Sequence, residues 1–428
     1  MRFIDHLSII FILTIQLMIS CNSDVAERDF LQADTALFLG NSITFAGGYI
    51  DYFEAFIRTR YPEKPITLVN RGMPSETIAG TTEETHIPPR PYLFNRWDEI
   101  FSRVSPDFVF ACYGMNDGIY QPFQEDLFRE FRQGVLLLEQ NLKENNVRDF
   151  AFLTPPPFEY RFFNHLPDTF SVFDYRNPSP DYNQTLVRYS DWLNQTVPER
   201  SIQIHDPLQT FLEAVHQIDS SFTLTVDGIH PNSTGHWLMA DQIIQQLGLI
   251  KPAPEIVVNA DNSSFGSPVI DADVSDSHVK IDAILHQLAP FDTAWNVTAL
   301  EESGYNKRYN NMYLQVKNIP DGDYAVIIVD DTLDVVSSEY LSQGVKLNLI
   351  EADRLKLRGQ KLLRLIHEKR ELEKNLWVVS SDHYRFEGMK KRLAVRKDLS
   401  SGKIDSLNSL INSLASPDTI SITVSSIK

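Results

Sequence analysis

Ser42 attracts attention because it directly follows a short apolar run in the stretch LFLGNSITF. The run at 36–40 predicts a buried strand, and an amphipathic pattern that predicts a helix begins at Tyr49. A serine at the exit of such a strand can be exposed at the edge of a sheet. Its hydroxyl is a weak nucleophile until a neighbouring base removes the proton. Ser42 alone therefore says little, since Gly-Asn-Ser occurs by chance at many strand ends.

A candidate base lies in the stretch VDGIHPNSTGH, far along the chain. Asp227 and His230 are three residues apart in a sequence that predicts a short turn before a helix. This spacing lets the aspartate accept from one imidazole nitrogen while the other nitrogen faces a serine. Those are the roles in a Ser-His-Asp triad, which is recognised by geometry rather than by chain order. The same residues also fit a turn with a helix cap, so both interpretations stay open here.

Two further stretches follow predicted strands and could donate hydrogen bonds to a reacting carbonyl group. NRGMPSET (70–77) follows the second strand, and YGMNDG (113–118) follows the third. Acyl transfer needs donors that point at the oxyanion of the tetrahedral intermediate. Asn116 offers an amide donor of this kind, although asparagine in such a turn commonly bonds the local backbone instead.

Strands and helices alternate from Thr35 to about Gly248. The predicted strands are short apolar runs at 36–40, 66–70, 107–114, 149–154 and 201–206. Between them lie helical patterns at 49–61, 125–145, 183–197 and 233–248. Such runs are typical of strands covered on both faces, and the alternation predicts a parallel sheet between layers of helices. In such sheets functional groups gather at the carboxyl ends of the strands.

Together the four stretches resemble the motifs of the SGNH (GDSL-type) hydrolase family, in the family's order along residues 36–248. The resemblance implies a flavodoxin-like three-layer α/β/α fold and ester hydrolysis without a metal or another cofactor. It implies that Ser42 is the nucleophile, that His230 is the general base and then acid, and that Asp227 orients the imidazole. The backbone N–H of Ser42 and the side chain of Asn116 would stabilise the oxyanion.

Two positions depart from the family's pattern. The first motif usually reads Gly-Asp-Ser, but here Asn41 occupies the middle position. Since that aspartate is not a triad member, Asn41 can keep the local hydrogen bonds. The second motif often carries a glycine whose N–H completes the oxyanion hole. Counting back from Thr77 places Ser75 there, with Gly72 three residues earlier, so we expect the N–H of Ser75 as donor and keep Gly72 as the alternative.

Two long loops at 85–97 and 155–183 are rich in proline and aromatic residues, and we expect them above the same sheet edge. Aromatic faces stack on sugar rings, and three arginines could pair with carboxylates or sulfates: Arg90, Arg161 and Arg176. The alternative is that most of these side chains only pack the loops together. Neither loop resembles the long apolar lid of a triglyceride lipase.

The segment GLIKPAPEI (248–256) carries two prolines and marks a predicted boundary between an SGNH domain at 30–250 and an accessory domain at 251–428. The accessory domain is predicted to be mixed and β-rich, with strands in PEIVVNADN, HVKIDAILHQL, WNVTAL, MYLQVKNIPDGDYAVIIVDD and TISITVSS, and with PDGD as a hairpin turn. A helix is predicted at about 350–375. Residues 346–397 hold fifteen Lys and Arg against seven Asp and Glu. We interpret this basic stretch as a solvated helix face packed on the first domain rather than a polyanion-binding surface.

The first 21 residues predict a lipoprotein signal peptide. Their apolar stretch of about a dozen residues is shorter than the ~20 that a membrane span needs. LMISC resembles a bacterial lipobox, which implies that Cys21 becomes lipidated and anchors the protein to a bacterial membrane, facing the periplasm or the cell surface. An uncleaved anchor and ordinary secretion are the alternatives. The other cysteine, Cys112, lies in an apolar run and is expected in the core.

The composition excludes one class of partner. A net charge of −18 and a pI near 5.0 argue against nucleic acid, because phosphate binding needs a basic face. No cluster of residues shows metal-ligand spacing, so we expect no metal. We expect a serine esterase that removes acetyl or other short acyl groups from carbohydrate, with an acylated oligo- or polysaccharide as its partner. The alternatives are a lysophospholipase or thioesterase of the same family, and a glycan-binding protein with an idle triad.

Overall fold

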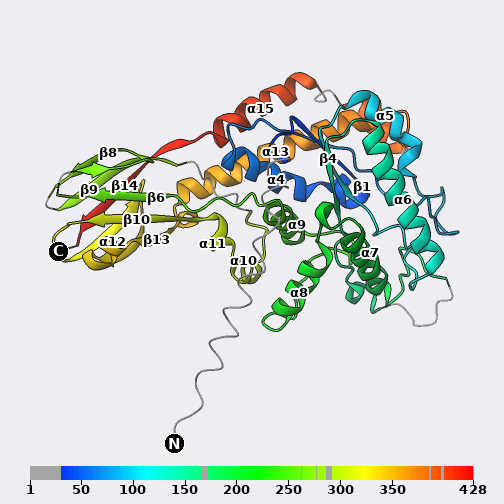
Figure 1. Cartoon of the computed structure of the whole chain (residues 1–428), viewed down its shortest axis with the longest axis horizontal. Coiled ribbons are helices and arrows are strands. Elements are labelled where there is room, and N and C mark those ends of the chain that lie inside the picture. Colours follow the sequence, from blue (N-terminus) through cyan, green and yellow to red (C-terminus); the bar gives the residue numbers. More distant parts are fainter. Residues whose placement is uncertain are drawn as a thin grey trace, which may run out of the picture.

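The computed structural model describes residues 30–165, 172–261, 263–275, 277–285, 292–384, 387–396 and 400–427 (Figure 1). The predicted signal peptide and its Cys21 lie outside these residues. Within the described ranges, no helix combines the length and the hydropathy that crossing a membrane requires.

The first half of the chain forms a five-stranded sheet whose described strand pairs are all parallel. The strands lie in the order β2-β1-β3-β4-β5, which is the order of the flavodoxin-like fold and confirms the predicted fold class. Their bounds are β1 Thr35–Gly40, β2 Thr67–Asn70, β3 Phe108–Cys112, β4 Asp149–Leu153 and β5 Ser201–Ile202. The fifth strand is shorter than predicted, because the chain enters a helix at His205.

Helices cover both faces of this sheet. Side chains of β1 alternate between the faces: Phe38 packs in the core with α4, α8 and α9, whereas Leu37 and Leu39 pack in the core with α5, α6 and α7. The sequence did not predict α5 and α8. The helices of this half are α3 Ser42–Ala46, α4 Gly48–Arg60, η1 Leu93–Arg96, α5 Trp97–Arg103, α6 Glu125–Glu144, η2 Tyr160–Phe163, α7 Tyr182–Thr196, η3 Pro198–Arg200, α8 His205–His216 and α9 Ser233–Gln246.

The second half contains two sheets around a separate apolar core, as predicted for a mixed β-rich part. One sheet has the order β13-β10-β6-β7 and includes a parallel pair, β10 with β6. The other has the order β12-β11-β14-β9-β8 and is antiparallel. The strands are β6 Glu255–Asn259, β7 Ser264–Phe265, β8 Val269–Val274, β9 His278–Leu285, β10 Asn311–Lys317, β11 Asp323–Ile328, β12 Asp331–Ser337, β13 Val345–Asn348 and β14 Asp418–Ser426.

Two details of the prediction for this half were wrong. The turn PDGD does not close a hairpin, because β10 and β11 on its two sides belong to different sheets and β11 pairs with β12. The stretch WNVTAL is not a strand, since helix α10 begins within it. Asn296 caps that helix by accepting a hydrogen bond from the N–H of Ala299 at 2.9 Å, and this cap outweighs the strand preference of the β-branched residues.

Helix α13 returns from the β-rich half to the α/β half, as its orange ribbon shows in Figure 1. Its Leu362, Ile366 and Leu372 share the core that contains α4, and so does Ile411 of α15. The core of the α/β half therefore also contains residues from beyond position 250. The helices of this half are α10 Val297–Glu302, α11 Tyr305–Tyr309, α12 Ser338–Gln343, η4 Leu349–Glu351, α13 Asp353–Ser380, α14 Glu387–Ala394 and α15 Ser401–Ala415.

Basic residues of α13 pair with buried carboxylates of α4. Arg370 donates to both carboxylate oxygens of Asp51, with a distance of 2.8 Å between Nη2 and Oδ2. Lys369 Nζ lies 2.6 Å from Glu54 Oε1, and these four side chains are at most 8% exposed. Burial opposes the charge of Asp51, but Arg370 outweighs burial and lowers the pKa of Asp51. The basic stretch packs on the first half as we interpreted it, but Lys369 and Arg370 are buried rather than solvated.

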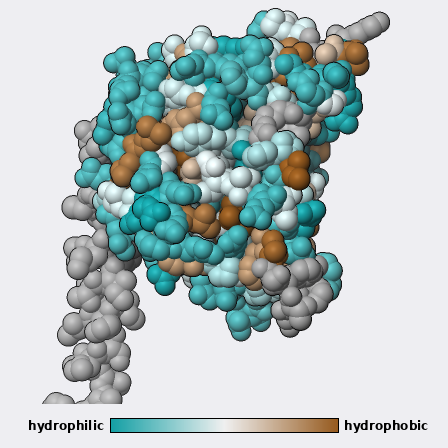
Figure 2. Space-filling view, turned by 90° about the vertical axis from the view of Figure 1, so that its right-hand side faces the viewer, coloured by the Kyte–Doolittle hydropathy of each residue, from teal (hydrophilic) through white to brown (hydrophobic). Residues whose placement is uncertain are grey.

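The face at the α/β end of the molecule is mostly hydrophilic, with small and separate hydrophobic patches (Figure 2). This agrees with a composition in which 57 Asp and Glu outnumber 39 Lys and Arg. Scattered apolar patches of this kind are normal on a protein surface and do not mark a binding site by themselves.

Candidate active site

Ser42 lies at the carboxyl end of β1, in the sharp turn that leads into α3. Asn41 caps this helix, and its Oδ1 accepts a hydrogen bond from the N–H of Ile43 at 3.0 Å. Gly40 is needed for close packing, because a Cβ there would lie 2.2 Å from Thr44 Oγ1. The asparagine therefore makes the local hydrogen bond that an aspartate would make. The N–H of Ser42 is one of the donors that a helix N-terminus leaves without an intrahelical partner.

His230 and Asp227 approach Ser42 from the turn before α9. The distance from His230 Nε2 to Ser42 Oγ is 2.8 Å, and that from His230 Nδ1 to Asp227 Oδ2 is 2.7 Å. The other carboxylate oxygen of Asp227 accepts from the backbone N–H of Ile229 at 3.0 Å and of His230 at 2.8 Å. The structure thus brings the three predicted residues into one hydrogen-bonded chain with the geometry of a nucleophile, a base and an orienting carboxylate.

Asp227 is held in its charged form. Burial opposes the charge, but hydrogen bonds from the side chain and backbone of His230 outweigh burial and lower the pKa of Asp227 to about 2. The carboxylate is 47% exposed, so water screens part of this interaction. A negative Asp227 favours the proton on Nδ1 of His230, which leaves Nε2 free to accept the proton of Ser42.

Glu159, which sequence analysis did not single out, holds the turn that carries Asp227. Its Oε2 accepts from the N–H of Leu224 at 3.0 Å, the N–H of Thr225 at 2.8 Å and the hydroxyl of Thr225 at 2.5 Å. Its own backbone N–H donates to the carbonyl oxygen of Gly228 at 2.9 Å. Burial raises the pKa of Glu159, and these hydrogen bonds oppose the rise. No local sequence motif predicts this role, because the hydrogen-bond partners of Glu159 are distant from it in sequence.

Asn116 is buried, and two hydrogen bonds hold its amide group. Oδ1 accepts from the hydroxyl of Tyr120 at 2.9 Å, and Nδ2 donates to the carbonyl oxygen of Glu76 at 3.1 Å. The carbonyl oxygen of Glu76 can only accept, so the contact with Glu76 decides which end of the amide is the donor. Because an amide nitrogen carries two hydrogens, Nδ2 keeps one for a substrate oxygen. Burial raises the pKa of Tyr120, so its hydroxyl stays protonated and can donate.

Ser75 stands in a tight turn beside the candidate nucleophile. The N–H of Glu76 closes this turn by donating to the carbonyl oxygen of Met73 at 3.2 Å, and Ser75 has φ of +64°. This is the left-handed conformation that glycine adopts at little cost, which accounts for the glycine in the family's pattern. Ser75 lines the same cavity as Ser42, and we keep its N–H as the expected backbone donor.

Gly72, the alternative backbone donor, has a structural role. Its N–H already donates to Asn70 Oδ1 at 2.8 Å. A Cβ at this position would lie 2.3 Å from the backbone nitrogen of Phe45, so glycine is required for the close approach of this loop to α3. The geometry therefore favours Ser75 over Gly72 as the backbone donor.

Asp117 connects the loop that carries Ser75 with the loop that carries Asn116. Its Oδ1 accepts from the N–H of Ile78 at 2.8 Å and of Ala79 at 2.9 Å, and its Oδ2 accepts from the N–H of Gly114 at 2.8 Å. Burial raises the pKa of Asp117 to about 6, against the effect of these hydrogen bonds. Asp117 therefore has a structural place and lies outside the chain of Ser42 and His230.

A cavity of about 530 Å³ opens beside these groups. The loop after Thr81 forms much of its wall, as predicted for 85–97, while Tyr175 and Arg176 come from the second predicted loop. The lining residues are Ser42, Pro74, Ser75, Thr85, His86, Ile87, Pro88, Pro89, Arg90, Pro91, Asn116, Tyr120, Tyr175, Arg176, Ile229 and His230.

The three arginines considered for substrate binding differ in their surroundings. Arg90 is buried and forms a two-pronged pair with Glu83, with distances of 2.5 and 2.6 Å. Arg161 does not line the cavity and donates to two backbone carbonyls at 2.9 and 3.2 Å. Arg176 lines the cavity with its side chain 57% exposed and lies 2.8 Å from Asp174. Arg90 also lines the cavity, but its side chain is 2% exposed, so Arg176 is the most accessible of the three to a substrate.

Metal ligands and reactive thiols are two other kinds of group that could do chemistry. In the part of the chain that the structure describes, no group of three or more His, Cys, Asp and Glu side chains could hold a metal ion. Cys112 is a buried free cysteine in β3, and burial raises its pKa to about 12. It behaves as a small core residue, as expected.

Comparison with known proteins agrees with this geometry. Residues 38–238 match the profile of the GDSL-like lipase/acylhydrolase family. An acetylxylan esterase from Geobacillus stearothermophilus is 23% identical over 232 residues, which cover 50% of this chain and 93% of that protein.

One similar solved structure has the same fold over most of this chain. A gut microbial diltiazem-metabolizing enzyme has a TM-score of 0.70 at 21% identity, covering 92% of this chain and 98% of its own. A catalytic mutant of an acetylxylan esterase from Geobacillus stearothermophilus has a TM-score of 0.36 at 22% identity, covering 50% of this chain and 94% of its own. Fold and profile together define a hydrolase domain of the type that acts on esters. The α/β half of this chain thus contains a domain that matches the GDSL-like, or SGNH, hydrolase family.

Proposed function

We propose that this protein is an extracytoplasmic serine esterase that removes acetyl and other short acyl groups from carbohydrate. The observation that carries the proposal is the hydrogen-bonded chain from Ser42 through His230 to Asp227 on the wall of an open cavity. A binding protein has no need for a nucleophile, its base and an orienting carboxylate in one line.

Acylation begins when Ser42 Oγ attacks the ester carbonyl and His230 Nε2 takes the hydroxyl proton. The carbonyl oxygen becomes an oxyanion, to which three N–H groups can donate: those of the Ser42 and Ser75 backbone and of Asn116 Nδ2. The negative Asp227 stabilises the imidazolium that forms. When the tetrahedral intermediate collapses, His230 returns the proton to the alcohol oxygen, and the sugar leaves with its hydroxyl restored.

Deacylation repeats these steps with water. His230 takes a proton from a water molecule, whose oxygen attacks the acyl carbonyl of Ser42. The second tetrahedral intermediate collapses, the Ser42 oxygen regains its proton from His230, and the short carboxylic acid leaves. The enzyme returns to its starting state without any redox change.

Two observations support carbohydrate as the substrate. The acetylxylan esterase from Geobacillus stearothermophilus is a relative of the α/β half at 23% identity. The cavity also presents aromatic rings, since the ring centroids of His86 and Tyr175 lie 5.8 Å apart and both residues line it. Tyr175 is 42% exposed, so its ring can stack on a sugar.

A substrate panel tests the proposal. Wild type and Ser42→Ala would be assayed on acetylated xylo-oligosaccharides and on 4-nitrophenyl esters of two to twelve carbons. We expect acetate release by wild type, none by Ser42→Ala, and labelling of Ser42 by a fluorophosphonate. A preference for acyl chains of eight carbons or more would favour the lysophospholipase or thioesterase alternative. Absence of both turnover and labelling would favour a glycan-binding protein.

The cellular location is a separate part of the proposal. We propose that a lipid on Cys21 anchors the protein to a bacterial membrane. Cys21→Ala should then move the protein from the membrane fraction to the periplasm or the medium. Membrane fractionation that does not change in this variant would contradict the anchor and leave the esterase proposal untouched.

A further inference from the structure

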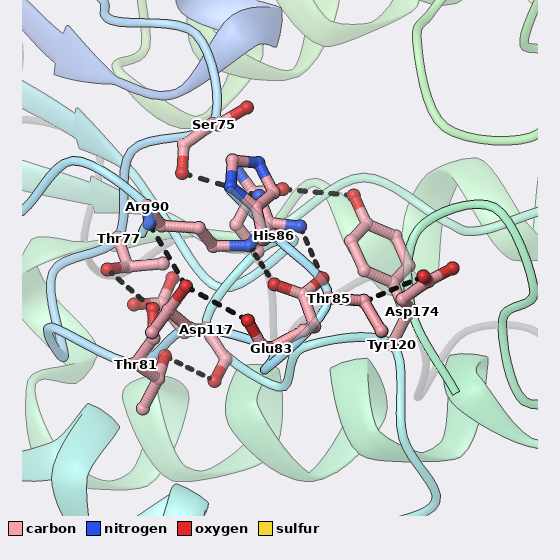
Figure 3. A network of polar contacts seen from close by, with 12 residues as sticks. Ser75, Thr77, Thr81, Glu83, Thr85, His86, Arg90, Asp117, Tyr120 and Asp174 are labelled. Atoms are coloured by element: carbon pink, nitrogen blue, oxygen red, sulfur yellow. Dashed lines mark hydrogen bonds and ion pairs between the residues drawn. The ribbon is translucent and has the colours of Figure 1, made fainter. Parts of the chain in front are cut away.

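Arg90 and Glu83 form a buried ion pair next to the cavity, and Figure 3 shows Arg90 between Glu83 and Ser75. Both side chains are 2% exposed. Nε and Nη2 of Arg90 are used by Glu83, at 2.5 and 2.6 Å. This leaves Nη1, which donates to the carbonyl oxygen of Ser75 at 3.3 Å. Because the guanidinium group is planar and rigid, its pairing with Glu83 also fixes the direction in which Nη1 points.

The same guanidinium group also contacts Tyr120. Its central carbon lies 5.5 Å from the centroid of the Tyr120 ring, within the range of a cation–π interaction. The hydroxyl of Tyr120 in turn donates to Asn116 Oδ1. Arg90 therefore contacts the turn that carries Ser75 directly. It contacts the amide of Asn116 indirectly, through the ring and the hydroxyl of Tyr120. Ser75 and Asn116 are the two proposed oxyanion donors that lie outside α3.

The turn at Ser75 needs such support. A non-glycine residue at φ of +64° is held in a strained, left-handed conformation that surrounding contacts must maintain. One end of the turn is fixed by Glu76, whose carboxylate pairs with Arg96 at 2.5 and 2.7 Å. The contact from Arg90 reaches the carbonyl of Ser75 itself.

We propose that the Arg90–Glu83 pair is a positioning device for the oxyanion hole, which it supports through the carbonyl of Ser75 and the ring of Tyr120. The inference rests on the proposed esterase function and deepens it. Arg90 acts through other groups and does not touch the reacting atoms. Glu83 keeps the guanidinium charged and in place, since a buried arginine without a partner would be strongly destabilising. Arg90 thus has a different role from the substrate contact considered for it from the sequence.

Arg90→Met tests this role with 4-nitrophenyl acetate. Loss of one oxyanion donor costs about 10²–10³ in kcat, and a displaced donor costs less, so we expect kcat to fall by about 10- to 100-fold. KM should change by less than about threefold, because the donors act mainly in the transition state. Binding of a boronic acid, which forms a tetrahedral adduct with the serine, should weaken in proportion to kcat/KM.

Two further variants keep the test sharp. Arg90→Lys keeps a positive charge beside Glu83 but lacks the forked guanidinium group. It should also lower kcat with little change in KM, and it serves as the test variant if Arg90→Met fails to fold. Tyr120→Phe removes one hydroxyl and should lower kcat without changing KM, because the amide of Asn116 loses one of the two hydrogen bonds that hold it.

A matched control separates positioning from stability. Arg308 pairs with Asp241 at 2.8 Å, with side chains 24% and 3% exposed, outside the cavity lining. Arg308→Met should destabilise the fold and leave kcat unchanged. If Arg90→Met also lowers stability alone, with kcat and boronate affinity intact, the pair is only structural and the inference is overturned. A wild type that is inactive on every ester would instead overturn the proposed function and this inference with it.

Discussion

Replacing Asp227 by asparagine should impair catalysis more than replacing it by alanine. Oδ1 of Asp227 accepts two backbone hydrogen bonds, from the N–H of Ile229 and of His230. An asparagine would keep its oxygen there, because only oxygen can accept these bonds. Its NH₂ group would then face Nδ1 of His230 and require that nitrogen to accept. The proton would move to Nε2, and His230 could no longer take the proton of Ser42.

The size of the loss depends on the exposure of the carboxylate. In a triad whose aspartate is buried, the wrong imidazole tautomer costs ~10⁴ in kcat. Here Asp227 is 47% exposed and water can compete with the new amide contact. We therefore expect a loss of about 10³ for Asp227→Asn. Asp227→Ala admits water, which can accept from Nδ1, and we expect a smaller loss of about 10².

The assay is kcat and KM on 4-nitrophenyl acetate at pH 8, together with the rate of fluorophosphonate labelling. KM should stay within about threefold of wild type, because the change affects the transition state. Asp206→Asn is the control, since Asp206 lies 3.0 Å from His205 in an Asp-His pair outside the cavity. Asp227→Asn with turnover within tenfold of wild type, or above that of Asp227→Ala, would refute the reasoning.

Three further predictions concern stability and the donor loop. Arg370→Met leaves Asp51 buried without its main partner and should lower the free energy of unfolding in urea by about 3–5 kcal/mol; Arg364→Met, on the exposed side of α13, should change it by less than about 0.5 kcal/mol. Burial raises the pKa of Glu373 to about 7, so the folded protein keeps a proton that the unfolded chain releases above its usual ~4.3. Stability should therefore fall as pH rises from about 4.3 to 7, and Glu373→Gln should raise the urea midpoint more at pH 8 than at pH 5. Ser75→Gly keeps the N–H and relieves the positive φ but loosens the unfolded chain, so kcat should stay within about threefold and stability within about 1 kcal/mol of wild type; a tenfold loss of kcat would show that the serine side chain is required.

The fold of the α/β half could be predicted from the sequence because its signals are local. Apolar runs such as 107–114 and 149–154 have the length and composition of strands buried on both faces, and both became strands of the sheet. Polar motifs follow these runs, and parallel strands bring their carboxyl ends to one edge. Ser42, Asn116 and His230 could therefore be named as candidates before their distances were known.

The β-rich half shows where local signals mislead. PDGD has the composition of a hairpin turn, but the same residues also suit a crossing between two sheets. Which strand pairs with β11 depends on the packing of both sheets, and the turn itself does not encode that choice. WNVTAL contains strand-forming residues, yet a cap at Asn296 is sufficient to begin a helix.

The kind of site follows from the residue types, since the chemistry of a serine, a histidine, an aspartate and an amide is a property of the residues and their motifs. The contacts that support this site depend on how the chain folds. Arg90 was a candidate substrate contact in the sequence, but its partner Glu83 and its contacts with Ser75 and Tyr120 make it internal. The physical reason is that a charge is stable in the interior only beside a partner. The partner of a buried charge is determined when distant segments pack together, so a local sequence pattern does not predict it.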